Sequence, residues 1–536
     1  MPTVDDLCRS YLDLKYHFDP AAASAAGLVV HDGRLGRFDV EAVRTHLAAL
    51  KAVAVAVEEL DVAELEEEID RTALLGELRS TIYRWEHEKP HVRNPGYWLS
   101  HLFQAQYAVI SRCEAAAAGR AGAMLERLEA VPAFLDAARA TLDEPPSVFV
   151  DAALIMLGGG GQLIAEVTAV MGVEEPALRE RLQAAGERAL QSLASFGSEL
   201  RDELEPSADP LAFAIGEVQF ARRLHHEHAL VAGAPELWRY GLRLQEETEA
   251  QLEALSGRFG GPWREVVDRL RNDAPAGDVL DVYRRELERA REAVVAAKLV
   301  KVPSSPLDVV PTPAFLAPLV PFAAYEPPPI YLGDQHGRFY VTRPDPALPA
   351  RTYAQQLRGH CRHAIAPMVV HEAYPGHHLQ LVTAQELASE VRRHVWTPIM
   401  VEGWALYCEQ LMEETGFYST AEERLFRLIN LLWRAVRVVL DVGLHTRGMT
   451  PAEAVDYMVA HLPIERSSAE AEVRRYCAWP TYQLCYAVGR REILRLRDGY
   501  KEKAGADFSL ARFHDTLLHY GGLPVSLARW GMDLAD

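Results

Sequence analysis

The sequence predicts a mainly α-helical protein, and two observations lead to that fold class. From about residue 40 to residue 300, Ala, Leu, Glu and Arg dominate, and apolar residues recur every three or four positions in places, as at Leu252 and Leu255. These residue types favour helices, and this spacing gathers apolar side chains on one helix face. After Ala354 the same texture returns and continues to the C-terminus. A large helical body is therefore expected, with one interruption.

The interruption is a proline-rich connector. Prolines recur every few residues from Pro303 to Pro329, which argues against a helix there. Residues 330–332 and 338–342 are β-rich runs on either side of a glycine-containing turn at residues 333–337, which predicts a small β-hairpin. The chain thus divides into a helical N-terminal part (1–300), a connector with its hairpin (301–350) and a helical C-terminal part (351–536).

Helix boundaries follow from the same reading. In the C-terminal part we expect helices over residues 353–370, 371–390, 400–415, 421–447, 451–461 and 467–497. In the N-terminal part, the glycine run at residues 158–161 lacks the Gly-Lys-Ser/Thr sequence of a phosphate-binding loop and predicts a helix break.

Composition bounds the partners and the location. The net charge is −20, and without a basic stripe such a surface argues against nucleic acid and anionic membranes as partners. An acidic N-terminus and cysteines without a CxxC pair predict reduced thiols in a cytoplasmic protein. The most apolar stretch, residues 154–157, runs into the glycines and looks too short to span a bilayer. The oligomeric state stays open, a homodimer included. The six cysteines are Cys8, Cys113, Cys361, Cys408, Cys477 and Cys485.

A first cluster with metal-site chemistry is His371-Glu372, followed after Pro375-Gly376 by His377 and His378. Zinc peptidases present two histidines one helical turn apart, with a glutamate beside the first as general base. Six or seven residues on a straight helix do not place two imidazoles on one ion. Pro375 should kink or bulge the helix, and a bulge that absorbs two residues returns His377 to the one-turn position. His378 is the alternative ligand.

A second cluster supplies carboxylates. Glu402 and Glu409 are seven residues apart, on one face of a helix that also carries Trp404. A carboxylate among apolar residues is costly unless it is paired or metal-bound. We therefore predict Glu402 as the third metal ligand and Glu409 as the acceptor that holds a histidine ring. Glu386 and Glu390, nearer the histidines, are the competing candidates.

A third cluster lies within residues 474–490. Amide hydrolysis passes through an oxyanion that needs donors besides the metal, and Tyr486 or Tyr482 would supply one. Arg475 or Arg490 would hold a substrate carboxylate bidentately. On the predicted hairpin, Tyr340 is expected to line the cleft as a substrate contact.

Residues 371–380 and 402–407 resemble the signatures of the bacterial family catalogued as domain of unknown function 885, and the resemblance extends over most of the chain. That family in turn resembles the helical gluzincin zinc metallopeptidases, such as the thermostable carboxypeptidases and oligopeptidases. The resemblance implies zinc bound by His371, His377 and Glu402, with Glu372 as base. Two extra residues within residues 373–375 depart from the gluzincin pattern, which leaves His377 against His378 open.

We therefore expect a zinc-dependent hydrolase, with a metallopeptidase-like helical body and the hairpin beside its active-site cleft. Zinc held by two imidazoles and a carboxylate keeps a position for water, and Glu372 takes the proton of that water and delivers it to the leaving amine. The substrate would be a peptide or a small amide. An amidohydrolase or lyase acting on a small metabolite is the alternative, and a non-catalytic scaffold is the weakest reading because all the ligands are present.

The histidines within residues 225–228 predict only a polar helix face.

Overall fold

The structure, a computed structural model, describes residues 2–111, 119–313, 320, 322–333 and 336–534. Cys113, two connector prolines and the tip of the predicted turn lie outside these residues. Contacts group the chain into two compact units. The first comprises Met1–Asp61, Glu77–Phe213 and Pro329–Gln335, and the second comprises Val62–Gly76, Ala214–Pro328 and His336–Asp536. The predicted division into three parts was based on residue composition along the chain. Its connector contributes residues to both units.

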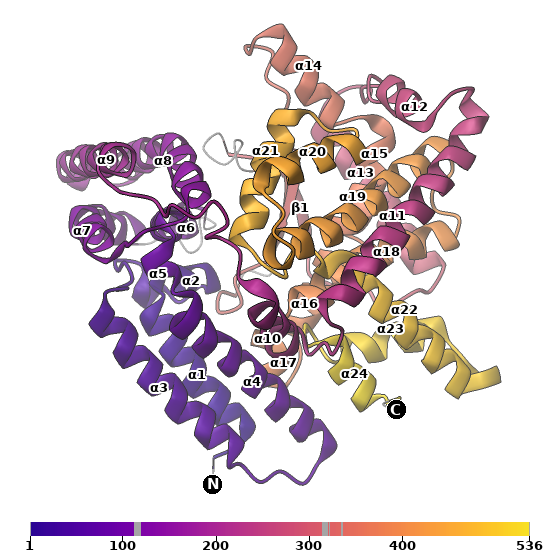
Figure 1. Cartoon of the computed structure of the whole chain (residues 1–536), viewed down its shortest axis with the longest axis horizontal. Helices are drawn as coiled ribbons and strands as arrows, with labels where there is room; N and C mark the ends of the chain where they lie inside the picture. Colours follow the sequence, from indigo (N-terminus) through magenta and orange to yellow (C-terminus); the bar gives the residue numbers. More distant parts are fainter. Residues whose placement is uncertain (1, 112–118, 314–319, 321, 334–335, 535–536) are drawn as a thin grey trace. The chain divides into compact units, whose positions relative to one another are not determined.

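The first unit is helical. Its helices are α1 (Val4–Phe18), α2 (Pro20–Ala26), α3 (Val40–Glu58), the end of α4 (Leu65–Tyr83), α5 (Pro90–Arg93), α6 (Pro95–Ile110), α7 (Arg120–Thr141), α8 (Ser147–Glu174) and α9 (Arg179–Asp202) (Figure 1). A π-helical turn, Arg84–Glu88, follows α4.

The predicted helix break at residues 158–161 is wrong, because α8 continues through the glycines. A Cβ at Gly160 would overlap the ring of Phe103 on α6, so this glycine lets two helices pack closely. The uninterrupted helix is also longer than the sequence suggested. By length and composition α8 could cross a membrane, a test that core helices of soluble proteins also pass, and a third of its apolar window is buried.

The second unit carries the clusters with metal-site chemistry. It contains α10 (Gly216–His228), α11 (Ala234–Ser256), α12 (Trp263–Leu270), α13 (Val279–Ala296), α14 (Ala350–Gly359), α15 (Arg362–Glu372), α16 (His377–Gln385), α17 (Glu390–His394), α18 (Pro398–Glu414), α19 (Ala421–Thr446), α20 (Pro451–His461), α21 (Arg466–Ala478), α22 (Cys485–Ala504), α23 (Leu510–Leu518) and α24 (Val525–Gly531). The mainly α fold class is thus confirmed.

A small mixed sheet replaces the predicted hairpin. Its strands are β1 (Leu307–Pro311), β2 (Ala323–Glu326) and β3 (Gly337–Val341), in the order β1-β3-β2. β3 pairs parallel with β1 and antiparallel with β2. The run at residues 330–332 forms no strand, so the predicted hairpin partner is wrong. The true partners come from within the proline-rich connector, where the prolines excluded a helix but left short strands between them.

The core of this unit is formed by apolar side chains of α10, α11, α18, α19 and α22. α18 and α22 approach so closely that a Cβ added to Gly403 would lie 2.6 Å from the backbone of Gly489. The predicted single helix over residues 467–497 is wrong, because it divides into α21 and α22 at residues 479–484.

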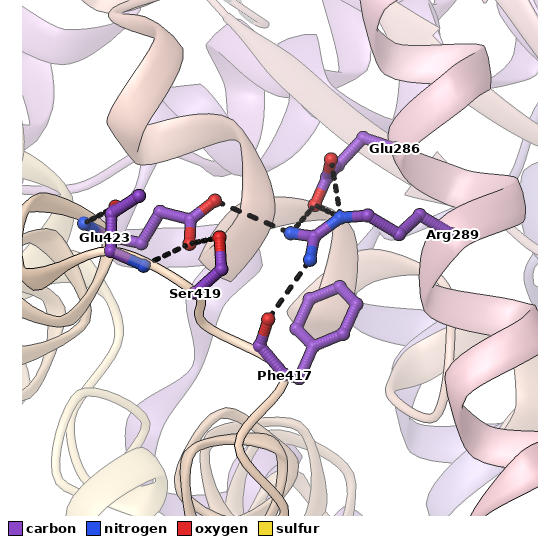
Figure 2. Close-up of polar contacts among 6 residues, drawn as sticks. Glu286, Arg289, Phe417, Ser419 and Glu423 are labelled. Carbon is purple, nitrogen blue, oxygen red and sulfur yellow. Dashed lines mark hydrogen bonds and ion pairs between the residues drawn. The ribbon is translucent and has the colours of Figure 1, made fainter.

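Arg289 of α13 fixes the loop between α18 and α19 (Figure 2). Its Nη1 donates to the carbonyl oxygen of Phe417 at 3.0 Å, and its guanidinium lies 3.8 Å from the centre of the Phe417 ring. The same guanidinium pairs with Glu286 and reaches Glu423 at 3.4 Å. Glu423 also completes a capping box with Thr420, which starts α19. The connection between α18, which carries Glu402 and Glu409, and α19 is therefore fixed by these contacts.

Candidate metal centre

The first helix break places the two histidines. α15 ends at Glu372, residues 373–376 are non-helical, and α16 starts at His377. The N–H of Gly376 donates to the carbonyl oxygen of Val370 at 3.1 Å. A Cβ on Gly376 would overlap this oxygen and that of His371, so the turn requires glycine. The expected distortion at Pro375 is therefore a four-residue break and not a two-residue bulge.

The carbonyl oxygen of Pro375 anchors this break to α18. It accepts the indole N–H of Trp404 at 2.8 Å and lies 3.6 Å from Sγ of Cys408. Trp404 is completely buried. An indole among the carboxylates of α18 thus holds the histidine segment in place.

His371, His377 and Glu402 converge. Nε2 of His377 lies 3.3 Å and Nε2 of His371 lies 3.7 Å from Oε2 of Glu402. The three residues each offer one ligand atom, and these atoms lie within 4.8 Å of one another. Ligand atoms about 2.0–2.1 Å from a tetrahedral zinc are about 3.3 Å apart. The distances of 3.3 Å and 3.7 Å from Glu402 to the two imidazoles are therefore close to those in a zinc site.

The polar atoms of this group also fit a cation. Oε2 of Glu402, which faces the two imidazoles, is buried and accepts no hydrogen bond among the described residues. Burial opposes charge on Glu402, but His371 and His377 lower its pKa well below the usual range. Burial likewise opposes charge on His371, yet Glu402 and Glu409 raise its pKa to about 9. The surroundings favour positive charge between these side chains, and two imidazoles with one carboxylate form a donor set that suits zinc.

Glu409 orients His371 from behind. Nδ1 of His371 and Oε1 of Glu409 are 2.9 Å apart, and Oε2 of Glu409 accepts Nδ2 of Asn430 at 3.1 Å. Glu409 is fully buried. Because this carboxylate holds the Nδ1 side of the ring, Nε2 is the ring nitrogen that faces Glu402 and would bind an ion.

Glu372 and His378 lie on the side of the β-sheet. Oε2 of Glu372 accepts the backbone N–H of Tyr325 in β2 at 3.2 Å. His378 faces away from Glu402, since its ring nitrogens lie 3.1 Å from the hydroxyl of Tyr325 and 3.1 Å from the carbonyl oxygen of Ser305. Burial lowers the pKa of His378 to about 4. The structure therefore brings His377, and not His378, to Glu402.

The second helix break, at residues 479–484, brings two tyrosines close to the metal group. The hydroxyl of Tyr482 donates to Oε1 of Glu402 at 2.6 Å. The ring of Tyr486 stacks on His371 with centroids 6.2 Å apart. Burial and the charge of Glu402 raise the pKa of both tyrosines. Tyr482 thus holds Oε1 of Glu402, and Oε2 of the same carboxylate faces the histidines. The hydroxyl of Tyr486 has no hydrogen-bond partner among the described residues.

The two predicted carboxylate-binding arginines differ in position. Arg475 lies close enough to Tyr486 to influence its pKa, and its Nη2 donates to Glu472 at 2.7 Å. Arg490 donates to Oε1 of Gln410 at 2.8 Å through Nε and lines a separate cavity of about 490 Å³.

Three other predicted residues lie outside the converging group. Tyr340 is buried in β3, on the opposite face from Gly337, at which an added Cβ would lie 2.8 Å from His378. Glu386 is exposed where α16 ends, and Glu390 ion-pairs with basic side chains of α17. Neither of these competing glutamates reaches the histidines.

The histidine run of α10 forms no second group. Within the described ranges, His371, His377 and Glu402 form the one set of three converging His, Cys, Asp or Glu side chains. His228 is buried, in contrast to the predicted polar face, and its ring lies 2.7 Å from Oγ1 of Thr397 and 3.2 Å from Oγ1 of Thr481.

A row of polar side chains on α19, called the α19 row, was not predicted from the sequence. Its members are Asn430, Arg434, Arg437 and Asp441. Asp441 accepts the N–H groups of Thr481 and Leu484, each at 3.0 Å, and so holds the second helix break. Burial raises the pKa of Asp441 to about 7. Polar residues spaced by four, three and four positions in the otherwise apolar stretch 428–444 were the signal that marks this row.

Two solved structures share the fold. A candidate lipoprotein of unknown function from Shewanella oneidensis matches with a TM-score of 0.81 and 23% identity over 99% of this chain and 100% of that one. A candidate lipoprotein from Colwellia psychrerythraea matches with a TM-score of 0.81 and 20% identity over 99% of both chains. No curated protein matches the sequence.

These neighbours correct the predicted location. Lipoproteins are anchored to membranes by a covalent lipid and are not cytoplasmic, and two proteins with this fold are described as members of that class. The cytoplasmic assignment is therefore wrong as an inference, because acidic charge and unpaired cysteines do not separate this chain from such proteins.

The family assignment rests on the sequence itself. The profile of the bacterial proteins of unknown function grouped as DUF885 matches residues 20–532, which is nearly the whole chain. Both helix breaks and all the converging side chains lie within that match. The chain therefore belongs to the DUF885 family.

Proposed function

We propose that this protein is a zinc-dependent hydrolase that cleaves peptide bonds, in the manner of the helical gluzincins. One observation carries the proposal: two imidazoles and a carboxylate converge beside a glutamate that follows the first imidazole in sequence. The buried Oε2 of Glu402 supports it, because this oxygen accepts no hydrogen bond and faces both imidazoles, and a buried carboxylate is costly unless positive charge neutralises it.

The residues divide the work as follows. His371, His377 and Glu402 would hold the ion, which when bound supplies Lewis acidity and makes water more acidic. Glu372 accepts a proton from water and passes it to the leaving nitrogen. The hydroxyl of Tyr486 is available to donate to the oxygen on which charge develops.

A peptide substrate is favoured by the position of β2. This outer strand of the sheet directs the N–H of Tyr325 to Glu372 and not to β3. An extended peptide that paired with β2 would therefore run past the proposed base. A small amide, or another reaction on a small metabolite, would need no such strand.

Metal content and turnover in matched variants test the proposal. The protein is stripped with a chelator, reloaded with zinc and analysed for metal, and cleavage of a mixed peptide library is followed by mass spectrometry. We expect one zinc per chain and peptide cleavage. Glu402→Ala should lose both, and Glu372→Gln should keep zinc but lose cleavage by about 1,000-fold or more.

Glu386→Gln is the matched control. Glu386 is a nearby glutamate that the structure leaves exposed, so this variant should keep zinc and activity. A wild-type protein that binds no zinc, or Glu372→Gln protein with full activity, would contradict the proposal. Cleavage of small amides without cleavage of any peptide would favour the amidohydrolase reading.

A further inference from the structure

Arg434 is the member of the α19 row without a partner of its own. Its Nε is buried without a hydrogen-bond partner, and its Nη1 reaches only the carbonyl oxygen of Asn430, one turn back, at 3.4 Å. In the part of the chain that the structure describes, no carboxylate lies within ion-pair distance of its guanidinium. A guanidinium offers five donors in a planar fork, and most of those of Arg434 are unused.

This arginine lies beside the candidate metal centre. Its Cζ is 5.5 Å from the centre of the Tyr486 ring, and that ring stacks on His371. Burial opposes charge on Glu409, but the bond from His371 and the charge of Arg434 lower its pKa. Arg434 and His371, a proposed metal ligand, therefore both contact the ring of Tyr486.

Three arginines lie around Tyr486. Arg437 lies 4.9 Å from the centre of its ring, and Arg475 is the third cation close to it. Glu472 pairs with both of these, at 3.1 Å and 2.7 Å, and their charges lower its pKa to about 2 against the effect of burial. One carboxylate is thus shared by two arginines, and none is left for Arg434.

A purely structural role fits Arg434 poorly. Arg127 of the first unit shows what such a role looks like, because it is completely buried and its guanidinium donates to backbone carbonyls and to the hydroxyl of Ser24. Arg434 is only partly buried, but its Nε is buried without an acceptor, and an unpaired buried donor costs free energy on folding. Its retention beside a reaction centre indicates a ligand that completes it.

We propose that Arg434 binds a carboxylate of the substrate close to the scissile bond. This inference rests on the proposed function and narrows its substrates to peptides with an anionic group at that position. The carboxylate matches the guanidinium fork and accepts two parallel hydrogen bonds from it. It belongs either to the C-terminus of the peptide or to an acidic side chain, and both sources present the same chemistry to Arg434.

Three forms of one peptide library separate the two sources. One form has free C-termini and only neutral side chains, the second is C-terminally amidated, and the third is amidated and contains Glu where the others contain Gln. With zinc-loaded wild-type protein, we expect one carboxylate-bearing form to be cleaved roughly 10- to 100-fold better, by kcat/KM, than the neutral form.

Arg434→Gln should abolish this preference, so that within this variant the carboxylate-bearing and neutral forms are cleaved with kcat/KM values equal to within about 3-fold. Arg434→Lys keeps the charge without the fork and should recover part of the preference. Arg424→Gln is the matched control, because it removes the same charge from the same helix, about 15 Å along its axis.

A binding measurement keeps the test independent of turnover. Calorimetry on chelator-treated protein compares N-acetylglycine with N-acetylglycinamide as probes. Tighter binding of the acid to wild-type and Arg424→Gln protein, lost in Arg434→Gln, supports the inference even if no peptide is cleaved and the proposed function fails. Equal binding of acid and amide, or a carboxylate preference that survives in Arg434→Gln, overturns it and leaves the hydrolase proposal standing.

Discussion

Two helix breaks bring side chains to the candidate metal centre, and they are held in opposite ways. At residues 373–376 the break exposes a carbonyl oxygen, that of Pro375, and Trp404 donates to it. At residues 479–484 the break exposes N–H groups, and Asp441 accepts them. The first break positions the histidines, and the second positions Tyr482 against Glu402.

The two breaks differ in where the residues that cause them lie in the sequence. The first lies in its own sequence, because Pro375 and Gly376 end the helix locally and Gly376 leaves no space for a Cβ. The second depends on a carboxylate about 40 residues away on α19. Thr481 within it adopts a positive φ of 66°, which a β-branched residue rarely does unless its surroundings impose it. A substitution should therefore disrupt the first break by steric overlap at Gly376. It should disrupt the second break by removing the carboxylate that accepts its N–H groups.

The largest effect is expected from Gly376→Ala. The added methyl group would overlap two carbonyl oxygens of α15, and backbone atoms cannot move aside as a flexible side chain can. We expect a loss of about 3 kcal/mol in the free energy of unfolding and a fall of at least about 100-fold in zinc affinity. Urea denaturation and competition with a chromophoric chelator measure the two quantities.

Gly499→Ala in α22 is the control for that substitution. A Cβ at Gly499 meets no atom within 4 Å, so alanine should stabilise the helix by about 0.5–1 kcal/mol and leave zinc binding unchanged. If Gly376→Ala behaved in the same way, the close approach at the first break would not matter for the site.

The second break is tested by Asp441→Ala. This change leaves the buried N–H groups of Thr481 and Leu484 without an acceptor, at a cost of about 3 kcal/mol in the free energy of unfolding. Asp456→Ala, in an exposed ion pair with Arg466, should cost less than about 0.5 kcal/mol. Equal losses from the two aspartates would show that Asp441 does not hold the break.

These two breaks also show how much the sequence could predict. Helices that begin with a local signal were located well, as at Thr420 and Thr450, whose capping boxes start α19 and α20. The division of residues 467–497 was missed because its cause, Asp441, is distant in the chain. The pairing of β1 and β2 with β3 was missed for the same reason, since register between remote strands leaves no local trace.

The candidate site follows the same rule. The spacing of histidines and glutamates in the sequence predicted the converging group, because the chemistry of a metal site restricts its residue types. Asn430 and Arg434 were not found, because each has meaning only through a distant partner, Glu409 for one and the ring of Tyr486 for the other. A row of polar residues along an apolar helix would have drawn attention to both.

The pH dependence of stability should report on the second break. Burial raises the pKa of Asp441 from its usual 3.8 to about 7 in the folded chain. Between these values the folded chain binds one proton more than the unfolded chain, so the contribution of Asp441 falls as pH rises, by up to about 1.4 kcal/mol per pH unit. The slope is obtained as the difference between wild-type and Asp441→Asn protein, and a difference that does not change from pH 4 to pH 7 would contradict it.

The smallest effect is expected from Trp404→Phe, which removes only the donor to Pro375. The loss of one buried hydrogen bond and part of a ring should cost about 1–2 kcal/mol and weaken zinc binding about 10-fold. Trp98→Phe is a close match, since Trp98 is equally buried and donates to a backbone carbonyl, that of His91, at the same 2.8 Å. Both variants should lose similar stability, but only Trp404→Phe should weaken zinc binding, because Trp98 belongs to the first unit and the metal group belongs to the second. Equal zinc affinity in the two variants would mean that Gly376 alone maintains the first break, and that the indole contributes packing and nothing to the position of the histidines.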